Sequence, residues 1–417
     1  MNRMIAVLSE HDAHDQMNSK NKMTQKEIIV LCCLIVLSLE YVLHYYIDLG
    51  ILPKMLIYVN TFAAVIMPVY SFFVKRKNLK FSAYSTVLLC YFIAMLGYTV
   101  VLMKYSGRMS RDVVCITIYL QILSAILLQD LKLEYLNRFF KILGCLSIIG
   151  FIYCFFSFNI DIEVAINRGY QYEEIFYYAA LFWSAVPFVL IAFIKKKNYF
   201  LPIACLALEV IINLIIVKRM ILVQVLVLSI VLIVALVLDK RAKGKGKNII
   251  KIVCAIGIAL LLMRCFMWDT IVKLFESILE RTKDVTENLS NFNRFVESKN
   301  YYKDATLLQI IFGKGFGGTH KGLGTVSEAL HVGWANLGLK GGLILIALVI
   351  IPYVKMLVIA GKYRNFPDEI KFSFLYLLYM GPMLFLINMH SFNPQMFLFF
   401  YCCIKIMNYR YSALNNL

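Results

Sequence analysis

One histidine stands where it could act as a general base. His331 lies in the stretch EALHVGW, just before an apolar run long enough to enter a membrane. An imidazole changes protonation near neutral pH and can take a proton from a substrate hydroxyl. The alternative is a single interfacial histidine without a chemical role. His320 is less attractive, because it falls in a part of the chain expected to be flexible.

Three basic residues are candidates for holding an anion. Lys218 and Arg219 interrupt a long apolar stretch, which places them at the tip of a tight hairpin or in a polar cavity. A hairpin tip that reaches lipid phosphates is the alternative. Arg294 lies in a long polar segment, with Glu297 as a candidate ion-pair partner. A guanidinium stays charged and can bind a phosphate through two parallel hydrogen bonds, which matters if the substrate is phosphorylated.

A glycine cluster precedes His331. Gly313, Gly315, Gly317 and Gly318 surround Lys314, but the pattern is not GxxxxGK[ST], so no nucleotide-binding loop is predicted. Glycine lets the backbone turn sharply or approach a ligand closely. We expect this stretch to turn the chain back and to present His331.

The composition predicts the elements that position these residues. Hydrophobic residues make up 61% of the 417 and charged residues 16%, with a mean hydropathy of +0.73. About 20 apolar residues span a bilayer as a helix, so we expect an all-α, polytopic membrane bundle. About twelve spans are predicted, at 28–47, 53–74, 81–103, 113–129, 139–158, 176–194, 199–217, 220–238, 249–267, 337–360, 371–388 and 393–409.

The net charge of +18 serves as a signal of topology. Basic clusters at 75–80, 195–197 and 240–247 lie between apolar segments, as short cytoplasmic loops do. This arrangement places both termini in the cytoplasm, and no nucleic-acid partner is predicted.

One long loop then faces outward. Trp268–Asn336 carries equal numbers of basic and acidic residues, unlike the basic inner loops. Within it, an amphipathic helix is predicted over Asp269–Thr282. Two further helices are predicted, around Ser290–Ser298 and over Lys303–Phe312, the second ending at Gly313.

Metal chemistry is not predicted. The eleven cysteines lie in or beside apolar segments without metal-ligand spacing, so we interpret them as small core residues. Asp161 and Glu163 are expected to be solvated residues of a short outer loop. No metal and no cofactor is expected.

Five short motifs in order resemble the O-antigen polymerase and ligase superfamily. They are VKR (Val217–Arg219), NRF with Arg294, FGKGFG (Phe312–Gly317), EALHVGW (Glu328–Trp334) and LGLKGG (Leu337–Gly342). Two positions differ from the family pattern. His331 is followed by Val332 instead of asparagine, with Asn336 five positions later, and Lys218 stands where a serine is common.

The resemblance implies a fold and a division of the chain. The fold would be a GT-C-like bundle in the bacterial cytoplasmic membrane. Residues 1–27 would form a cytoplasmic segment, 28–267 the first nine helices, 268–336 the outer loop with part of the active site, and 337–417 the last three helices and a cytoplasmic C-terminus.

The resemblance also implies an activity. The chain would polymerise undecaprenyl-diphosphate-linked oligosaccharide repeat units on the outer face, by metal-independent, inverting glycosyl transfer. Arg219 and Arg294 would hold the diphosphate, and His331 would be the base. Secondary candidates for the site are Lys218, Lys314, Glu328 and Arg168.

Two alternatives remain open. A ligase would transfer the same lipid-linked glycan to a lipid core, a peptide or a protein. A flippase or other secondary transporter of lipid-linked oligosaccharides would also have about twelve helices. Membrane lipid, a chain-length regulator and a flippase are the partners expected for a polymerase.

Overall fold

The computed structural model describes thirteen segments of the chain, to which every structural statement below is confined. They are residues 25–39, 50, 58–75, 81–102, 109–157, 184–196, 198–215, 220–238, 293–315, 318–321, 326–327, 330–385 and 394–409. These residues form thirteen α-helices, one 3-10 helix and one pair of two-residue strands. The predicted all-α class is confirmed.

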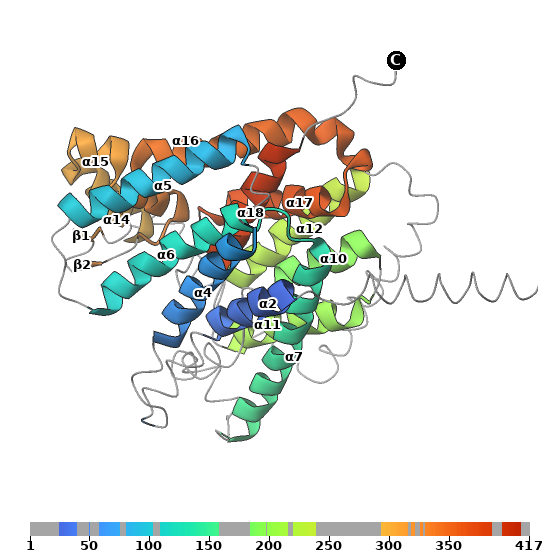
Figure 1. Cartoon of the computed structure of the whole chain (residues 1–417). Coiled ribbons are helices and arrows are strands. Elements are labelled where there is room, and N and C mark those ends of the chain that lie inside the picture. Colours follow the sequence, from blue (N-terminus) through green and yellow to red (C-terminus); the bar gives the residue numbers. More distant parts are fainter. Residues whose placement is uncertain are drawn as a thin grey trace, which may run out of the picture.

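The first half of the described chain forms eight helices (Figure 1). They are α2 (Gln25–Ser38), α4 (Tyr58–Lys75), α5 (Ala83–Leu102), α6 (Met109–Leu127), α7 (Leu133–Ser157), α10 (Ala185–Lys195), α11 (Phe200–Ile215) and α12 (Met220–Leu238).

The second half adds short elements at one edge, one long helix along the top of the view and two shorter helices further in (Figure 1). They are α14 (Asn293–Asp304), α15 (Leu307–Phe312), β1 (His320–Lys321), β2 (Val326–Ser327), α16 (Gly333–Ile359), the 3-10 helix η5 (Ala360–Asn365), α17 (Asp368–Met383) and α18 (Gln395–Asn408). The two strands pair antiparallel, with His320 opposite Ser327.

Helices occupy eleven of the twelve predicted spans. The span 249–267 and the amphipathic helix predicted at 269–282 lie outside the described residues. Several predicted boundaries were wrong: α15 begins at Leu307 instead of Lys303, α14 continues to Asp304 instead of ending near Ser298, and α7 begins at Leu133 instead of 139. Thr306 caps α15, because its hydroxyl accepts from the Gln309 N–H at 3.4 Å and the Gln309 side chain accepts from the Thr306 N–H at 3.1 Å.

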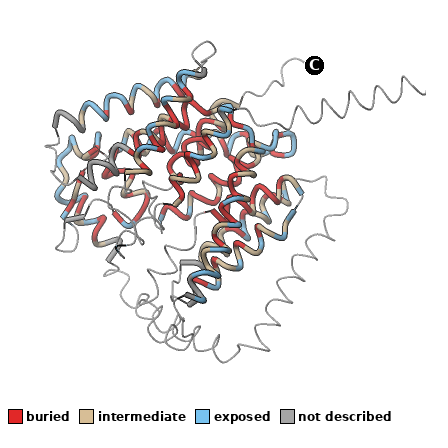
Figure 2. Tube along the Cα trace, turned by 60° about the horizontal axis from the view of Figure 1, so that its bottom comes forward, coloured by how far each residue is buried: buried red, intermediate tan, exposed pale blue. Residues whose placement is uncertain are grey.

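The core is built around α17 and α18, whose side chains are buried on nearly all sides (Figure 2). Aromatic rings fill it, including the fully buried Phe372, Phe397 and Tyr401. Two buried polar groups there are paired with groups elsewhere in the chain. Tyr401 donates to the carbonyl of Leu131 at 2.6 Å, and the side chain of Gln121 accepts from the N–H of Phe397 at 3.2 Å.

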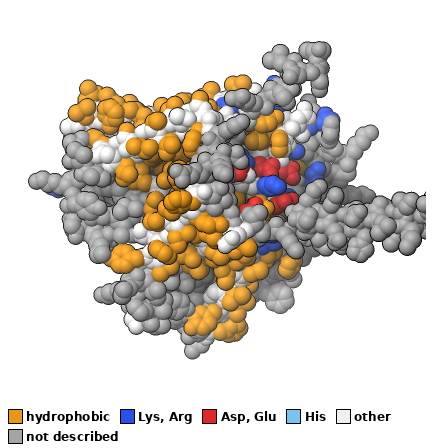
Figure 3. Space-filling view, viewed as in Figure 1, with side chains coloured by type: hydrophobic (Ala, Val, Ile, Leu, Met, Phe, Trp, Pro, Cys, Tyr) orange, Lys and Arg blue, Asp and Glu red, His pale blue; other side chains and the backbone are white. Residues whose placement is uncertain are grey.

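The outer faces of many helices are also apolar (Figure 3). Large hydrophobic side chains are exposed along α4, α7, α12 and α16, for example Phe73, Ile149, Val237 and Val358. Within the described part, Leu133–Tyr153 and Gly333–Asn365 are long and apolar enough to cross a bilayer, and eight shorter helices are apolar. Soluble monomers rarely expose apolar surface on this scale.

Three tyrosines hold α5 along α16. Tyr84 and Tyr91 donate to the carbonyls of Leu348 and Gly341, both at 2.8 Å. Tyr98 is 3.5 Å from the carbonyl of Gly313, just after α15. The seven-residue spacing puts the three rings on one face of α5, so this helix braces both α16 and the end of α15.

Candidate functional site

A junction between two glycine motifs fixes the backbone of this region. Gly342 kinks α16 with a φ of 63°, and a Cβ at this position would overlap the carbonyl oxygen of Ile311. A Cβ on Gly313, whose φ is 76°, would lie 2.6 Å from the backbone nitrogen of Gly341. The N–H of Lys314 donates to the carbonyl of Leu339 at 2.6 Å. The stretches FGKGFG and LGLKGG therefore meet backbone to backbone, where only glycine fits.

Glu297 lies between two histidines that are far away in the sequence. Its side chain, on α14, is 5% exposed. One carboxylate oxygen, Oε2, is 2.8 Å from Nδ1 of His331 and accepts from the His331 backbone N–H at 3.1 Å. The other oxygen, Oε1, is 3.0 Å from Nε2 of His320. We refer to Glu297, His320 and His331 as the Glu297 cluster.

The hydrogen bonds decide which ring nitrogens carry hydrogen. An ionised carboxylate only accepts, so Nδ1 of His331 and Nε2 of His320 must both donate. In the neutral His331 ring, Nε2 is then unprotonated. The His331 side chain is 63% exposed, so this nitrogen is accessible to a ligand. The arrangement is that of a general base oriented by a carboxylate.

Glu297 is held in its charged form. Burial raises the pKa of this carboxyl, but hydrogen bonds from the ring and backbone of His331 and from the ring of His320 outweigh burial. The net result is a pKa below the ordinary glutamate value. Glu297 is therefore a carboxylate at neutral pH, placed where it would stabilise a positive charge on the His331 ring.

His320 is a buried member of the cluster, and the expectation that it lies in a flexible part was wrong. Its side chain is 1% exposed, and its ring packs edge-on against Tyr301 at a centroid distance of 6.4 Å. Pairing of β1 with β2 and the hydrogen bond to Glu297 fix it in place. Within the described residues, its Nδ1 and the Tyr301 hydroxyl are both buried without a hydrogen-bond partner.

The backbone that carries His331 is held from several sides. The side chain of Asn336 accepts from the N–H of Leu330 at 3.1 Å. Leu330 and Val332 are buried in a small apolar cluster with Tyr301. Trp334 donates through its indole N–H to the carbonyl of Gly381 and through its backbone N–H to the carbonyl of Leu384, both at 3.1 Å. Asn336, noted in the sequence as displaced from the family position, thus supports the turn before α16.

Two lysines stabilise the loop that leads to His320. Lys314 donates to the carbonyl of Thr319 at 3.2 Å, and its ammonium lies 5.3 Å from the centre of the Tyr301 ring. Lys340, buried on α16, donates to the carbonyl of Gly318 at 3.2 Å. Burial lowers the pKa of Lys314, partly offset by Asp304. Lys314, a secondary candidate for the site, therefore lies close to the Glu297 cluster, where it stabilises the loop that leads to His320.

Arg219, Lys218, Arg168 and Glu328 lie outside the described residues. Arg294 belongs to the first turn of α14, three positions before Glu297, but its side chain lies outside the described part. In the described segments, no group of three or more histidine, cysteine or acidic side chains is arranged to hold a metal ion.

Two residues of the Glu297 cluster, Glu297 and His320, were not predicted from the sequence as site residues. Glu297 was considered only as a partner for Arg294, and His320 was set aside. No local pattern signals that these residues meet His331, because the contacts join positions 23 and 34 apart. The one available signal was compositional: two histidines and an acidic residue within a single polar segment of an apolar chain.

No protein-family model, no curated protein and no solved structure matches this chain. The function is therefore argued from the geometry of the cluster and the character of the surrounding helices.

Proposed function

We propose that this protein is a multi-pass membrane glycosyltransferase of the bacterial cytoplasmic membrane that polymerises undecaprenyl-diphosphate-linked oligosaccharide repeat units. The proposal depends on the pairing of Glu297 with His331. Nδ1 of His331 is hydrogen-bonded to the carboxylate, and the exposed side chain leaves Nε2 available to a substrate. The exposed apolar faces of α4, α7, α12 and α16 support a membrane location.

The reaction assigns each group a defined task. The acceptor sugar hydroxyl gives its proton to Nε2 of His331, and its oxygen attacks C1 of the donor sugar. The bond between C1 and the diphosphate oxygen breaks, and its electron pair leaves with the diphosphate. Glu297 stabilises the positive charge on His331 during this step. Attack opposite the leaving group inverts the anomeric centre.

The leaving diphosphate needs compensation for its charge. Arg219 and Arg294 are proposed to supply it, since arginine can bind a diphosphate bidentately without a metal. The position of Arg294 supports this role. Arg294 lies in the first turn of α14, about one turn before Glu297, which accepts the hydrogen bond from His331. The base and one proposed diphosphate ligand are thus tied to one short element.

A ligase would use the same groups with a different acceptor, so the geometry serves both.

A transporter of lipid-linked oligosaccharides is the second candidate, and one observation favours it. Glu209 on the apolar helix α11 is buried, with 6% of its surface exposed. Ionisable groups within apolar helices are typical of transport pathways.

The proposal is tested by His331→Ala in cells that depend on this chain for surface glycan. We expect polymer to be lost while single lipid-linked repeat units accumulate on the outer face. Lys299→Ala is the matched control, because Lys299 is exposed on α14 beside Glu297. Accumulation of repeat units on the inner face would instead identify a transporter. Normal polymer in the His331 variant would overturn the proposed base.

A further inference from the structure

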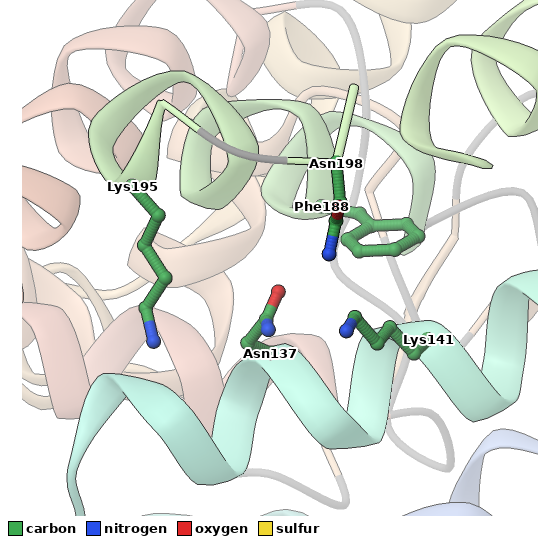
Figure 4. A pocket seen from close by; sticks show the side chains of 5 residues that line it. All are labelled: Asn137, Lys141, Phe188, Lys195 and Asn198. Carbon is green, nitrogen blue, oxygen red and sulfur yellow. The ribbon is translucent and has the colours of Figure 1, made fainter. Parts of the chain in front are cut away.

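A second polar site, a small cavity, lies in the described part of the chain, away from the Glu297 cluster. A cavity of about 180 Å³ opens between α7 and the turn that joins α10 to α11. Its lining residues are Asn137, Lys141, Phe188, Lys195 and Asn198 (Figure 4). In Figure 1, α14 and the strands lie at the left edge and α10 at the right, so the cavity and the cluster occupy different sides of the molecule.

Two elements supply the polar lining. Asn137 and Lys141 stand four residues apart on α7 and therefore share one helical face. Lys195 ends α10, and Asn198 follows in a tight turn with a φ of 54°. Figure 4 shows the polar ends of Asn137, Lys141 and Asn198 gathered around one space, with Lys195 at its edge and the Phe188 ring beside it.

Three of these four groups are hydrogen-bond donors without an acceptor among the described residues. In the part of the chain that the structure describes, no hydrogen bond or ion pair engages Asn137, Lys141 or Asn198. Lys195 has only a contact of 3.8 Å to Glu134, whose side chain is 66% exposed. Two ammonium groups and two carboxamides around one cavity suit a small anion with several oxygens, such as a phosphate.

The surface beside the cavity is apolar. Phe200, two residues after Asn198, is 87% exposed, and Ile203 follows on the same helix. On α7, Ile142 and Ile149 are exposed next to Lys141. A free phosphate would gain nothing from these side chains, whereas the acyl chains of a lipid would cover them. Basic pockets between helices near the cytoplasmic surface bind lipid headgroups.

We propose that this cavity binds the headgroup phosphate of an anionic phospholipid, with the acyl chains against α7 and α11. The inference rests on the membrane location within the proposed function, and it is independent of the reaction at His331. The predicted topology agrees, because the basic cluster at 195–197 is expected on the cytoplasmic side, where anionic lipids are abundant.

The test uses the full-length protein purified in detergent and stripped of lipid. Phosphatidylglycerol and phosphatidylcholine with identical acyl chains are added separately, and binding is measured by native mass spectrometry and thermal unfolding. We expect one tightly bound phosphatidylglycerol. Lys141→Gln and Lys195→Gln should each weaken its binding roughly tenfold, as expected for the loss of one charge-assisted contact.

Lys196→Gln is the matched control, since Lys196 is exposed in the same turn and does not line the cavity. It removes the same charge and should leave binding unchanged. An equal loss in this control would mean diffuse attraction and overturn the proposal. So would equal binding of phosphatidylcholine, or displacement of the lipid by inorganic phosphate at a similar concentration, which would identify free phosphate as the ligand.

The variants are checked for folding by their unfolding temperature without lipid, and Asn137→Ala provides a second way to weaken the cavity without removing charge. None of these measurements requires turnover. A failed lipid test therefore leaves the glycosyltransferase proposal standing, and a failed polymer assay leaves the lipid site standing.

Discussion

The Glu297 cluster and the cavity lined by Lys141 and Lys195 are both polar regions in an apolar helical chain, but their polar groups behave differently. In the cluster, each carboxylate oxygen has a donor, and the exposed Nε2 of His331 is left facing outward. In the cavity, donors from α7 and from the α10–α11 turn converge, and among the described residues only Lys195 has an acidic partner, the exposed Glu134. Paired groups hold one another still, which suits proton transfer, whereas unpaired donors suit the binding of an anion.

The two regions also differ in how the backbone supports them. The cluster depends on a junction of glycines, on the Asn336 side chain and on Trp334, all of which restrain the chain around His331. The cavity lies at an exposed turn with left-handed backbone at Lys196 and Asn198. Changes in backbone should therefore damage the cluster, and changes in charge should damage the cavity.

The largest effect is expected from Gly342→Ala. The added methyl group would meet the Ile311 carbonyl at a φ of 63°, so the junction must open and the cluster must lose its geometry. We expect at least a hundredfold loss of polymer, measured as glycan chain length in cells, and a lower unfolding temperature.

Gly361→Ala is the control, because nothing lies within 4 Å of a Cβ there. Phosphatidylglycerol binding should survive in the Gly342 variant. Loss of this binding would show that the two regions are coupled, and normal polymer would show that the junction does not position His331.

Glu297→Gln should reduce polymer synthesis by about a hundredfold or more, in the range of general-base effects. A glutamine presents one acceptor and one donor, so it cannot accept from both histidines, and one ring must change tautomer. The measurement is the rate of polymer synthesis, together with the rate at which diethyl pyrocarbonate modifies His331.

Lys299→Ala serves again as the control on α14. Wild-type rates in the Glu297 variant would mean that His331 does not need an oriented tautomer. That result would mean that the paired groups of the cluster are not needed for proton transfer, which is the proposed difference from the cavity.

His320 should act as a positioning residue through Glu297. His320→Gln keeps an N–H donor near Oε1 of Glu297, whereas His320→Leu removes it. We expect roughly a tenfold fall in kcat for the leucine variant, with KM unchanged, and a smaller fall for glutamine. Equal effects of both substitutions would assign His320 to packing alone.

The charge of Glu297 should also appear in the pH dependence of stability. Its pKa in the folded protein is lower than the unfolded value of about 4.3, so the carboxylate stabilises the fold above that pH. This contribution is lost as the pH falls through the folded pKa. The difference in unfolding temperature between wild type and Glu297→Gln should therefore shrink as the pH falls below about 4. A difference that does not shrink in this acidic range would contradict the lowered pKa.

The smallest effect is expected from Tyr91→Phe. This change removes the hydroxyl that donates to Gly341 beside the kink in α16. The loss should be about 1 kcal/mol in the free energy of unfolding, typical of one buried hydrogen bond. Tyr153→Phe, at an exposed tyrosine of α7, should change stability by less. Equal effects would mean that α5 does not brace the junction through this hydroxyl.

Much of the local structure could be predicted from the sequence. Long apolar runs predicted helices at eleven places where helices are found, because a backbone among apolar side chains must satisfy its own hydrogen bonds. The end of α15 at Gly313 was also predicted, because glycine readily adopts the backbone that ends a helix. The start of α15 was not, because the capping role of Thr306 was overlooked.

The chemistry was only half predictable. The sequence alone determined that His331 lies at the end of a polar segment, just before an apolar helix. Residue types and their order along the chain are enough to show this. Only the tertiary structure decided that Glu297 and His320 join it, that Gly313 meets Gly342, and that Lys141 and Lys195 share a cavity. The physical reason is that a hydrogen bond or a close backbone contact depends on distance in space, which the packing of separate helices sets and which no local periodicity encodes.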